Sequence, residues 1–234
     1  MDTGGRLTGK AASEVLLLGR AADDARLVEN MSQKPAWLTA TGTPWTSGEA
    51  RPIYDNPWIS VAEYDAVAPT GAPALYGVVR FKNYALAVLP VHDDGTVVLV
   101  GQHRFALADY SWEIPEGGGA LTTNPLESAQ RELLEETGLE AADWRQVMRV
   151  QLSNSVTDER AFGYIATGLR AAKAQAHADD TEQLAIARVP FREALGAALD
   201  GSIQDVLTVA MLLRGYHMAR EGLLPGSLVR AMLG

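Results

Sequence analysis

Residues Gly117–Leu139, GGGALTTNPLESAQRELLEETGL, decide the fold of this 234-residue chain. The second half of the stretch carries three carboxylates, Glu132, Glu135 and Glu136, at a spacing of i, i+3 and i+4. This spacing puts them on one face of a helix. Like charges clustered in this way destabilise an isolated helix, and a divalent cation bound across them would remove that penalty. Ligands that are all oxygen favour a hard ion such as Mg²⁺ or Mn²⁺ over zinc.

Signals at both ends predict where this helix begins and ends. Asn124 can cap its N-terminus, Pro125 suits the first helical position, and Glu127 completes a capping-box-like pattern. Gly138 can take the left-handed conformation that ends a helix. The glycine-rich loop 115–119 before it lets backbone approach a phosphate or a metal closely. An apolar stripe facing away from the acids comprises Leu126, Ala129 and Leu133.

Composition narrows the class of protein. No apolar run is long enough to span a membrane. Zero cysteines exclude disulfides and thiolate zinc sites, and the net charge of −9 argues against nonspecific binding to a nucleic-acid backbone. A small anionic substrate is still compatible with this charge, because a bound metal reverses the local sign. We therefore expect a soluble, cytoplasmic enzyme without a nucleic-acid or membrane partner.

The chain divides into four segments by pattern. Residues 1–33 are expected to be a flexible or weakly helical extension, 34–82 an N-terminal β layer, 83–222 the main domain, and 223–234 a C-terminal tail. The β layer contains an antiparallel hairpin around the turn at 68–71. The main domain is expected to hold strands at 85–90, 96–100, 149–152, 161–167 and 184–189, and helices at 191–199 and 205–221. Mixed strands with flanking helices predict an α/β/α sandwich.

The stretch from Gly117 resembles the Nudix box, whose consensus ends in Arg-Glu-apolar-x-Glu-Glu-x-Gly-apolar. Arg131 and the residues after it match, and Thr123 is the one departure, standing where the family has a Glu that mostly braces the Arg. The resemblance implies a Nudix fold and Mg²⁺-dependent hydrolysis, with Mn²⁺ able to substitute. The metal ligands that it implies are Glu132, Glu135, Glu136 and the backbone carbonyl of Glu116.

Beyond the box, residues 50–222 look closest to the ADP-ribose and nucleotide-sugar pyrophosphatases. Residues 98–105, with Gln-x-Arg, and 112–117 resemble their segments before the box. The substrate of that group is a nucleoside diphosphate derivative, and ADP-ribose would give AMP and ribose 5-phosphate. The group often forms homodimers in which the N-terminal hairpin crosses to the second subunit. A homodimer is expected here because the hairpin has little core of its own, and whether it crosses stays open.

The resemblance implies five substrate-binding residues, because they stand at positions that match those of the family. Trp58 would stack on the nucleobase, with packing inside the hairpin as the alternative role, and Tyr76 would be its partner ring. Arg80 and Arg104 would hold the diphosphate or ribose, the alternative being a surface ion pair. Glu113 would contact the sugar or form a structural salt bridge.

The hydrolytic base has two candidates. Glu182, in the acidic loop before the last strand, aligns best with the base of the family, and Glu159, in the polar segment 153–160, competes with it. Glu136 is counted with the catalytic residues as well as with the ligands.

Two other functions stay open at this point. A Nudix-fold regulator would hold a nucleotide without cleaving it, although such members typically lose box glutamates. A housecleaning enzyme would instead cleave nucleoside triphosphates.

Overall fold

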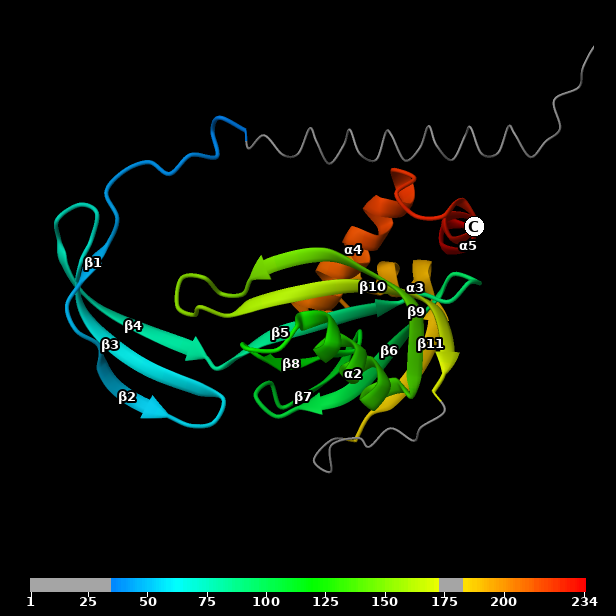
Figure 1. The fold of residues 1–234 in the computed structure, drawn as a ribbon, viewed down its shortest axis with the longest axis horizontal. Coiled ribbons are helices and arrows are strands. Elements are labelled where there is room, and N and C mark those ends of the chain that lie inside the picture. Colours follow the sequence, from blue (N-terminus) through cyan, green and yellow to red (C-terminus); the bar gives the residue numbers. More distant parts are fainter. Residues whose placement is uncertain (1–34, 173–182) are drawn as a thin grey trace, which may run out of the picture. The chain divides into compact units, whose positions relative to one another are not determined.

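The computed structural model in Figure 1 describes residues 35–172 and 183–234. The chain divides into two compact units, Met1–Pro44 and Trp45–Gly234. In the described part of the first unit, the Leu38 amide donates to the Pro35 carbonyl at 2.8 Å. The expected extension at 1–33 lies outside the described residues, and all strands and helices discussed below belong to the second unit.

An antiparallel N-terminal sheet opens the second unit. It contains β1 (Thr46–Ser47), β2 (Arg51–Asp55), β3 (Ile59–Val67) and β4 (Pro73–Phe81). β3 pairs with β1, β2 and β4. The β3–β4 hairpin expected around residues 68–71 is present, and Gly71 takes a φ of 87° in its turn.

Two further sheets form the centre of the molecule. A mixed sheet has the order β8-β5-β10-β9, in which β10 runs parallel to β5, and an antiparallel sheet has the order β11-β6-β7. The strands are β5 (Asn83–Pro90), β6 (Thr96–Arg104), β7 (Asp109–Glu113), β8 (Glu116–Ala120), β9 (Leu139–Gln151), β10 (Arg160–Ala171) and β11 (Ala185–Pro190).

Helices cover both faces of the mixed sheet, which confirms the expected α/β/α sandwich. They are α2 (Pro125–Thr137), α3 (Phe191–Leu199), α4 (Val206–Arg220) and α5 (Gly226–Leu233). β5 divides its buried side chains by alternation, so that Leu86 and Val88 pack with α2 while Ala87 and Leu89 pack with the other three helices. Among the helices in the described residues, none has the length and apolar content needed to cross a membrane.

The segment 223–234, expected as a C-terminal tail, contains α5 in the structure. Leu228 and Met232 of this helix are buried in the same cluster as α3 and α4. A Cβ added at Gly95 would lie 2.2 Å from the Ala231 carbonyl oxygen, so the β5–β6 turn also contacts α5 closely. The helix has eight residues, too few for a helical period to stand out from the sequence.

Candidate functional site

The helix that carries the acidic residues begins and ends where its capping residues predict. The Asn124 side chain accepts a hydrogen bond from the Leu126 amide at 3.1 Å. Gly138 has a φ of 67°, and its amide donates to the Leu134 carbonyl at 2.9 Å. These caps, together with a buried apolar face, fix the acidic face of α2 toward a cavity.

We call this cavity the box cavity, and its volume is about 430 Å³. It brings together the acidic face of α2, the start of β8, the junction of β4 and β5, and the residue before β11. The residues that line it are Trp58, Asn83, Glu116, Gly117, Gly118, Arg131, Glu132, Glu135, Glu136 and Leu184.

Each of the three glutamates of α2 that line the box cavity has a hydrogen-bonding or ionic partner. Arg131 pairs with both Glu132 and Glu135 and donates to the Gly118 carbonyl at 3.0 Å. Glu136 is 7% exposed and accepts a hydrogen bond from the Glu116 amide at 3.1 Å. Burial raises the pKa of Glu132, against the opposing effect of the Arg131 charge.

Gly117 is required by the close approach of Glu132. A Cβ at position 117 would lie 2.1 Å from the Glu132 carboxyl carbon. Any larger residue would therefore push this carboxylate out of its place in the wall of the cavity.

The donor chemistry of the box cavity fits a hard divalent cation. Three carboxylates and the backbone carbonyls at the start of β8 supply only oxygen ligands. As the side chains stand, no three acidic or histidine groups in residues 35–172 and 183–234 converge closely enough to hold a metal ion. Glu132 and Glu135 are instead paired with Arg131. A cation would therefore compete with this guanidinium for the two carboxylates.

Thr123, the departure from the box consensus, takes a different place in the structure. Its hydroxyl lies 2.9 Å from the Tyr84 hydroxyl and donates to the Ala120 carbonyl at 2.8 Å. It therefore closes the loop before α2, while Glu132, Glu135 and the Gly118 carbonyl hold Arg131.

Arg104 and Glu113, two of the predicted substrate residues, pair with each other. Arg104 Nε donates to Glu113 Oε1 at 3.0 Å, and Glu113 is 3% exposed. This hydrogen bond raises the pKa of Arg104 further above its ordinary value. Both residues line a second cavity between the β6–β7 hairpin and the start of α4. The salt bridge expected as the alternative for Glu113 is present, and its contact with a sugar stays a prediction.

Glu116 connects the box cavity to α4 in a way that the sequence analysis missed. Its carboxyl end is enclosed, and Thr208 Oγ1 donates to it at 3.1 Å. Burial raises its pKa well above the ordinary value, followed by the charge of Asp205 and a hydrogen bond with it, and by the charge of Glu113. The only signal in the sequence was an acid at a position where the family usually has Ala.

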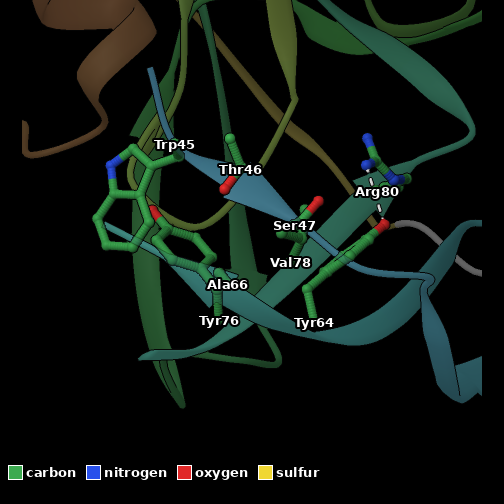
Figure 2. A pocket seen from close by; sticks show the side chains of 8 residues that line it. All are labelled: Trp45, Thr46, Ser47, Tyr64, Ala66, Tyr76, Val78 and Arg80. Carbon is green, nitrogen blue, oxygen red and sulfur yellow. Dashed lines mark hydrogen bonds between the residues drawn. The ribbon is translucent and has the colours of Figure 1, made fainter. Parts of the chain in front are cut away.

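Tyr76 and Arg80 line a third cavity, on the N-terminal sheet (Figure 2). Tyr76 packs edge-to-face against Trp45 with ring centroids 5.3 Å apart. Arg80 donates to the Tyr64 hydroxyl at 3.2 Å and pairs with Asp158 at 3.1 Å. Within one chain, Tyr76 therefore lines the third cavity, whereas Trp58 lines the box cavity.

The two candidate bases differ in what the structure says of them. Glu182 lies outside the described residues. Glu159 lies in the β9–β10 connection, where its carbonyl accepts the Leu152 amide at 3.1 Å. Burial, and then the charge of Asp158, raise its pKa. Glu159 is not among the residues that line the box cavity.

Comparison with known proteins relates the chain to a family of hydrolases. The family model described as NUDIX domain matches residues 82–208. An ADP-ribose pyrophosphatase of Mycobacterium tuberculosis is 30% identical over 140 residues, which cover 59% of this chain and 67% of the relative. A methanol dehydrogenase activator of Bacillus methanolicus is 30% identical over 157 residues, covering 67% of this chain and 84% of the relative.

A further relative and a solved structure agree with this picture. An ADP-ribose pyrophosphatase of Bacillus subtilis is 28% identical over 156 residues, covering 67% of this chain and 84% of the relative. A crystal structure of an ADP compounds hydrolase superposes with a TM-score of 0.70 at 18% identity, covering 79% of this chain and 98% of that one. At this identity the likeness supports the fold alone.

Proposed function

This chain belongs to the NUDIX family, and on that premise we propose that it hydrolyses the diphosphate linkage of ADP-ribose or a related nucleotide sugar. Water adds to one phosphorus and the bridging oxygen leaves with the other, so that ADP-ribose gives AMP and ribose 5-phosphate. The observation that carries the proposal is the box cavity, in which three glutamates of α2, the glycines at the start of β8 and an exposed tryptophan line one space. Two relatives that bear the name ADP-ribose pyrophosphatase support this substrate class.

Four residues of the box cavity would hold a divalent metal, which we propose is Mg²⁺ with Mn²⁺ as a substitute. They are Glu132, Glu135 and Glu136 through their carboxylates and Glu116 through its carbonyl. When bound, the ion supplies positive charge against the phosphoryl oxygens and lowers the pKa of a bound water. Arg131, released from Glu132 or Glu135, would stay at the wall of the cavity, where its charge favours the anionic diphosphate.

For the hydrolytic base we propose Glu182 over Glu159. Glu182 stands two residues before Leu184, which lines the box cavity. Glu159 is held in the β9–β10 connection and does not line it. The base would accept a proton from the attacking water.

Arg104 and Glu113 are proposed to act as a pair that binds the sugar side of the ligand. Glu113 is buried and holds the guanidinium through Nε and Nη2, and both residues line the second cavity. We propose that Tyr76 and Arg80 bind substrate through the third cavity, and that the enzyme is a cytoplasmic homodimer.

A substrate panel tests the proposed function. ADP-ribose, other nucleotide sugars, dinucleoside polyphosphates, NADH and nucleoside triphosphates are incubated with the enzyme in Mg²⁺ and in Mn²⁺, and products are separated by chromatography. Preferential release of a nucleoside monophosphate from ADP-ribose or a nucleotide sugar is the expected result. Preference for triphosphates would support the housecleaning alternative, and ligand binding without any cleavage would support a noncatalytic regulator.

A further inference from the structure

Asn83 is the first residue of β5, and its side chain lies in the wall of the box cavity. In the ladder between β5 and β8 it stands opposite Ala120. The carboxamide lies close to the glycines at the start of β8, because a Cβ added at Gly118 would be 3.7 Å from Asn83 Nδ2. The central strand β5 therefore brings a polar side chain to the cavity that α2 and β8 enclose.

The carboxamide of Asn83 makes no hydrogen bond to any residue of 35–172 or 183–234. Two other asparagines of the described chain are used differently. Asn56 accepts two backbone amides before β3, and Asn124 caps α2, so both hold the local structure. Asn83 is half-buried, and its two N–H donors and its acceptor are available to a group that enters the cavity.

An anionic diphosphate in the box cavity needs hydrogen-bond donors. Among the lining residues in the described part of the chain, Trp58, Asn83 and Arg131 carry N–H groups on their side chains. Arg131 is engaged by two glutamates and by the Gly118 carbonyl. The indole of Trp58 offers one donor on a large apolar ring. Asn83 therefore supplies a polar donor group that no residue of the described chain occupies.

A neutral donor suits a cavity that also holds carboxylates for a metal. A lysine or a second arginine at position 83 would pair with these carboxylates, as Arg131 does. A carboxamide donates hydrogen bonds without competing with a cation for its ligands. Fixed donors of this kind stabilise negative charge on an oxygen in a site from which water is partly excluded. The residue type at position 83 therefore fits contact with an anion beside a metal.

We infer that Asn83 is a further substrate-binding residue, and that its Nδ2 group donates a hydrogen bond to a phosphoryl oxygen of the diphosphate in the box cavity. The inference rests on the proposed function for the identity of the ligand. It adds a contact from β5 to those from α2 and β8. Asn83 changes no bond itself and holds the phosphoryl group while water attacks the phosphorus.

Two substitutions at position 83 distinguish a donated from an accepted hydrogen bond. Asn83→Ala removes the donor, so kcat/KM for ADP-ribose at saturating Mg²⁺ is expected to fall about tenfold. Asn83→Asp keeps the size and an acceptor, but it replaces the donor with a negative charge, so the expected fall is about a hundredfold. A wild-type value of kcat/KM in either variant would overturn the inference.

A control variant is needed because Asn83 also lines a neighbouring cavity of about 390 Å³. Arg160 lines this neighbouring cavity, is exposed and is not among the residues that line the box cavity. Arg160→Ala is expected to leave kcat/KM unchanged. A fall equal to that of Asn83→Ala would place the contact in the neighbouring cavity and would contradict the inference.

Calorimetry of ADP binding in Mg²⁺ separates this inference from the proposed function. Asn83→Ala is expected to raise the dissociation constant of ADP about tenfold, because one hydrogen bond to a charged oxygen is lost. If wild type binds ADP but cleaves nothing in the substrate panel, the proposed function fails, and the tenfold rise still supports the role of Asn83. Equal dissociation constants in the two proteins, or no binding of ADP to wild type, would overturn that role.

Thermal unfolding in a chelator distinguishes ligand binding from a structural role. Wild type and Asn83→Ala are expected to unfold at the same midpoint, because the carboxamide makes no hydrogen bond within the described chain. A large drop in the midpoint of the variant would assign Asn83 to the scaffold instead of the ligand.

Discussion

Glu116 is the residue at which the site and the scaffold meet. Its amide donates to Glu136 in the box cavity, and its carboxyl accepts from Thr208 on α4. The Ile114 amide in turn donates to the Thr208 hydroxyl at 3.0 Å. One residue therefore fixes a box glutamate with its backbone and the start of a helix with its side chain.

Replacing this acid is expected to stabilise the protein at neutral pH. The pKa of Glu116 in the folded state lies well above its ordinary value of 4.5, mainly through burial. Below pH 4.5 the carboxyl is protonated in the folded and in the unfolded state, so its burial carries no ionisation penalty. Between pH 4.5 and the raised pKa, the unfolded state loses its proton while the folded state keeps it. The free energy of unfolding therefore falls as pH rises through this range. The variant Glu116→Gln has no carboxyl to titrate, so it lacks this loss of stability, and it keeps the backbone carbonyl that is proposed to bind the metal.

Thermal unfolding in a chelator, measured from acid to neutral pH, checks this expectation. The midpoint of Glu116→Gln should exceed that of wild type by a margin that grows with pH. A margin independent of pH, or a wild type that is the more stable near neutrality, would contradict the assignment.

Some roles at this scale could be predicted from the sequence and others could not. The shared cavity of Glu132, Glu135 and Glu136 follows from helical spacing, which is local. The hydrogen bond between Glu116 and Thr208 joins distant segments, and nothing in either segment indicates the other. The separation of Tyr76 from Trp58 also depends on how a whole sheet lies, which spacing along one strand does not determine.

Among the elements, α2 and α5 show what a helix needs in order to be recognised. α2 has a capping Asn at one end, a left-handed Gly at the other and a clear apolar stripe, so its bounds follow from local rules. α5 has eight residues and no side-chain cap, and packing on α3 and α4 stabilises it. β5 and β6 were predicted as buried strands, but their assignment to different sheets depends on nonlocal pairing.

A truncation inside α5 tests its contribution to the core. Met232 is 1% exposed and belongs to the larger hydrophobic cluster. Met232→Ala is expected to lower the free energy of unfolding by about 2–5 kcal/mol, as for other large-to-small changes in a core. The exposed Leu199 of α3 offers a matched control, and Leu199→Ala should cost far less. Equal losses in urea unfolding would show that the C-terminal segment does behave as a tail.

At the scale of the whole molecule, the mixed sheet places α2 on one face and the other helices on the opposite face. The N-terminal sheet continues into β5 through a single residue, which brings Trp58 to the box cavity. The family could be recognised from one stretch because its glycine loop, Arg and glutamates are contiguous. The full set of residues that line the box cavity could not be predicted, because they come from five separate segments of the chain.

Binding of a divalent ion is expected to stabilise the whole molecule. A ligand that binds only the folded state at a hundred times its dissociation constant adds about 2.7 kcal/mol to the free energy of unfolding. The unfolding midpoint of wild type should therefore rise with Mg²⁺ or Mn²⁺ and return to its starting value in chelator. Glu132→Gln/Glu136→Gln should show little of this rise. An equal rise in both proteins would place the ion elsewhere.

The measurement that tests the central claim most directly is the metal-dependent cleavage of ADP-ribose by wild type, Glu136→Gln and Glu127→Gln. Glu127 lies exposed in the first turn of the same helix and does not line the box cavity, so it controls for a lost charge on α2. Wild type and Glu127→Gln should release AMP and ribose 5-phosphate in Mg²⁺, while Glu136→Gln should remain folded and lose roughly a hundredfold or more in turnover. Wild-type turnover in Glu136→Gln would contradict the account.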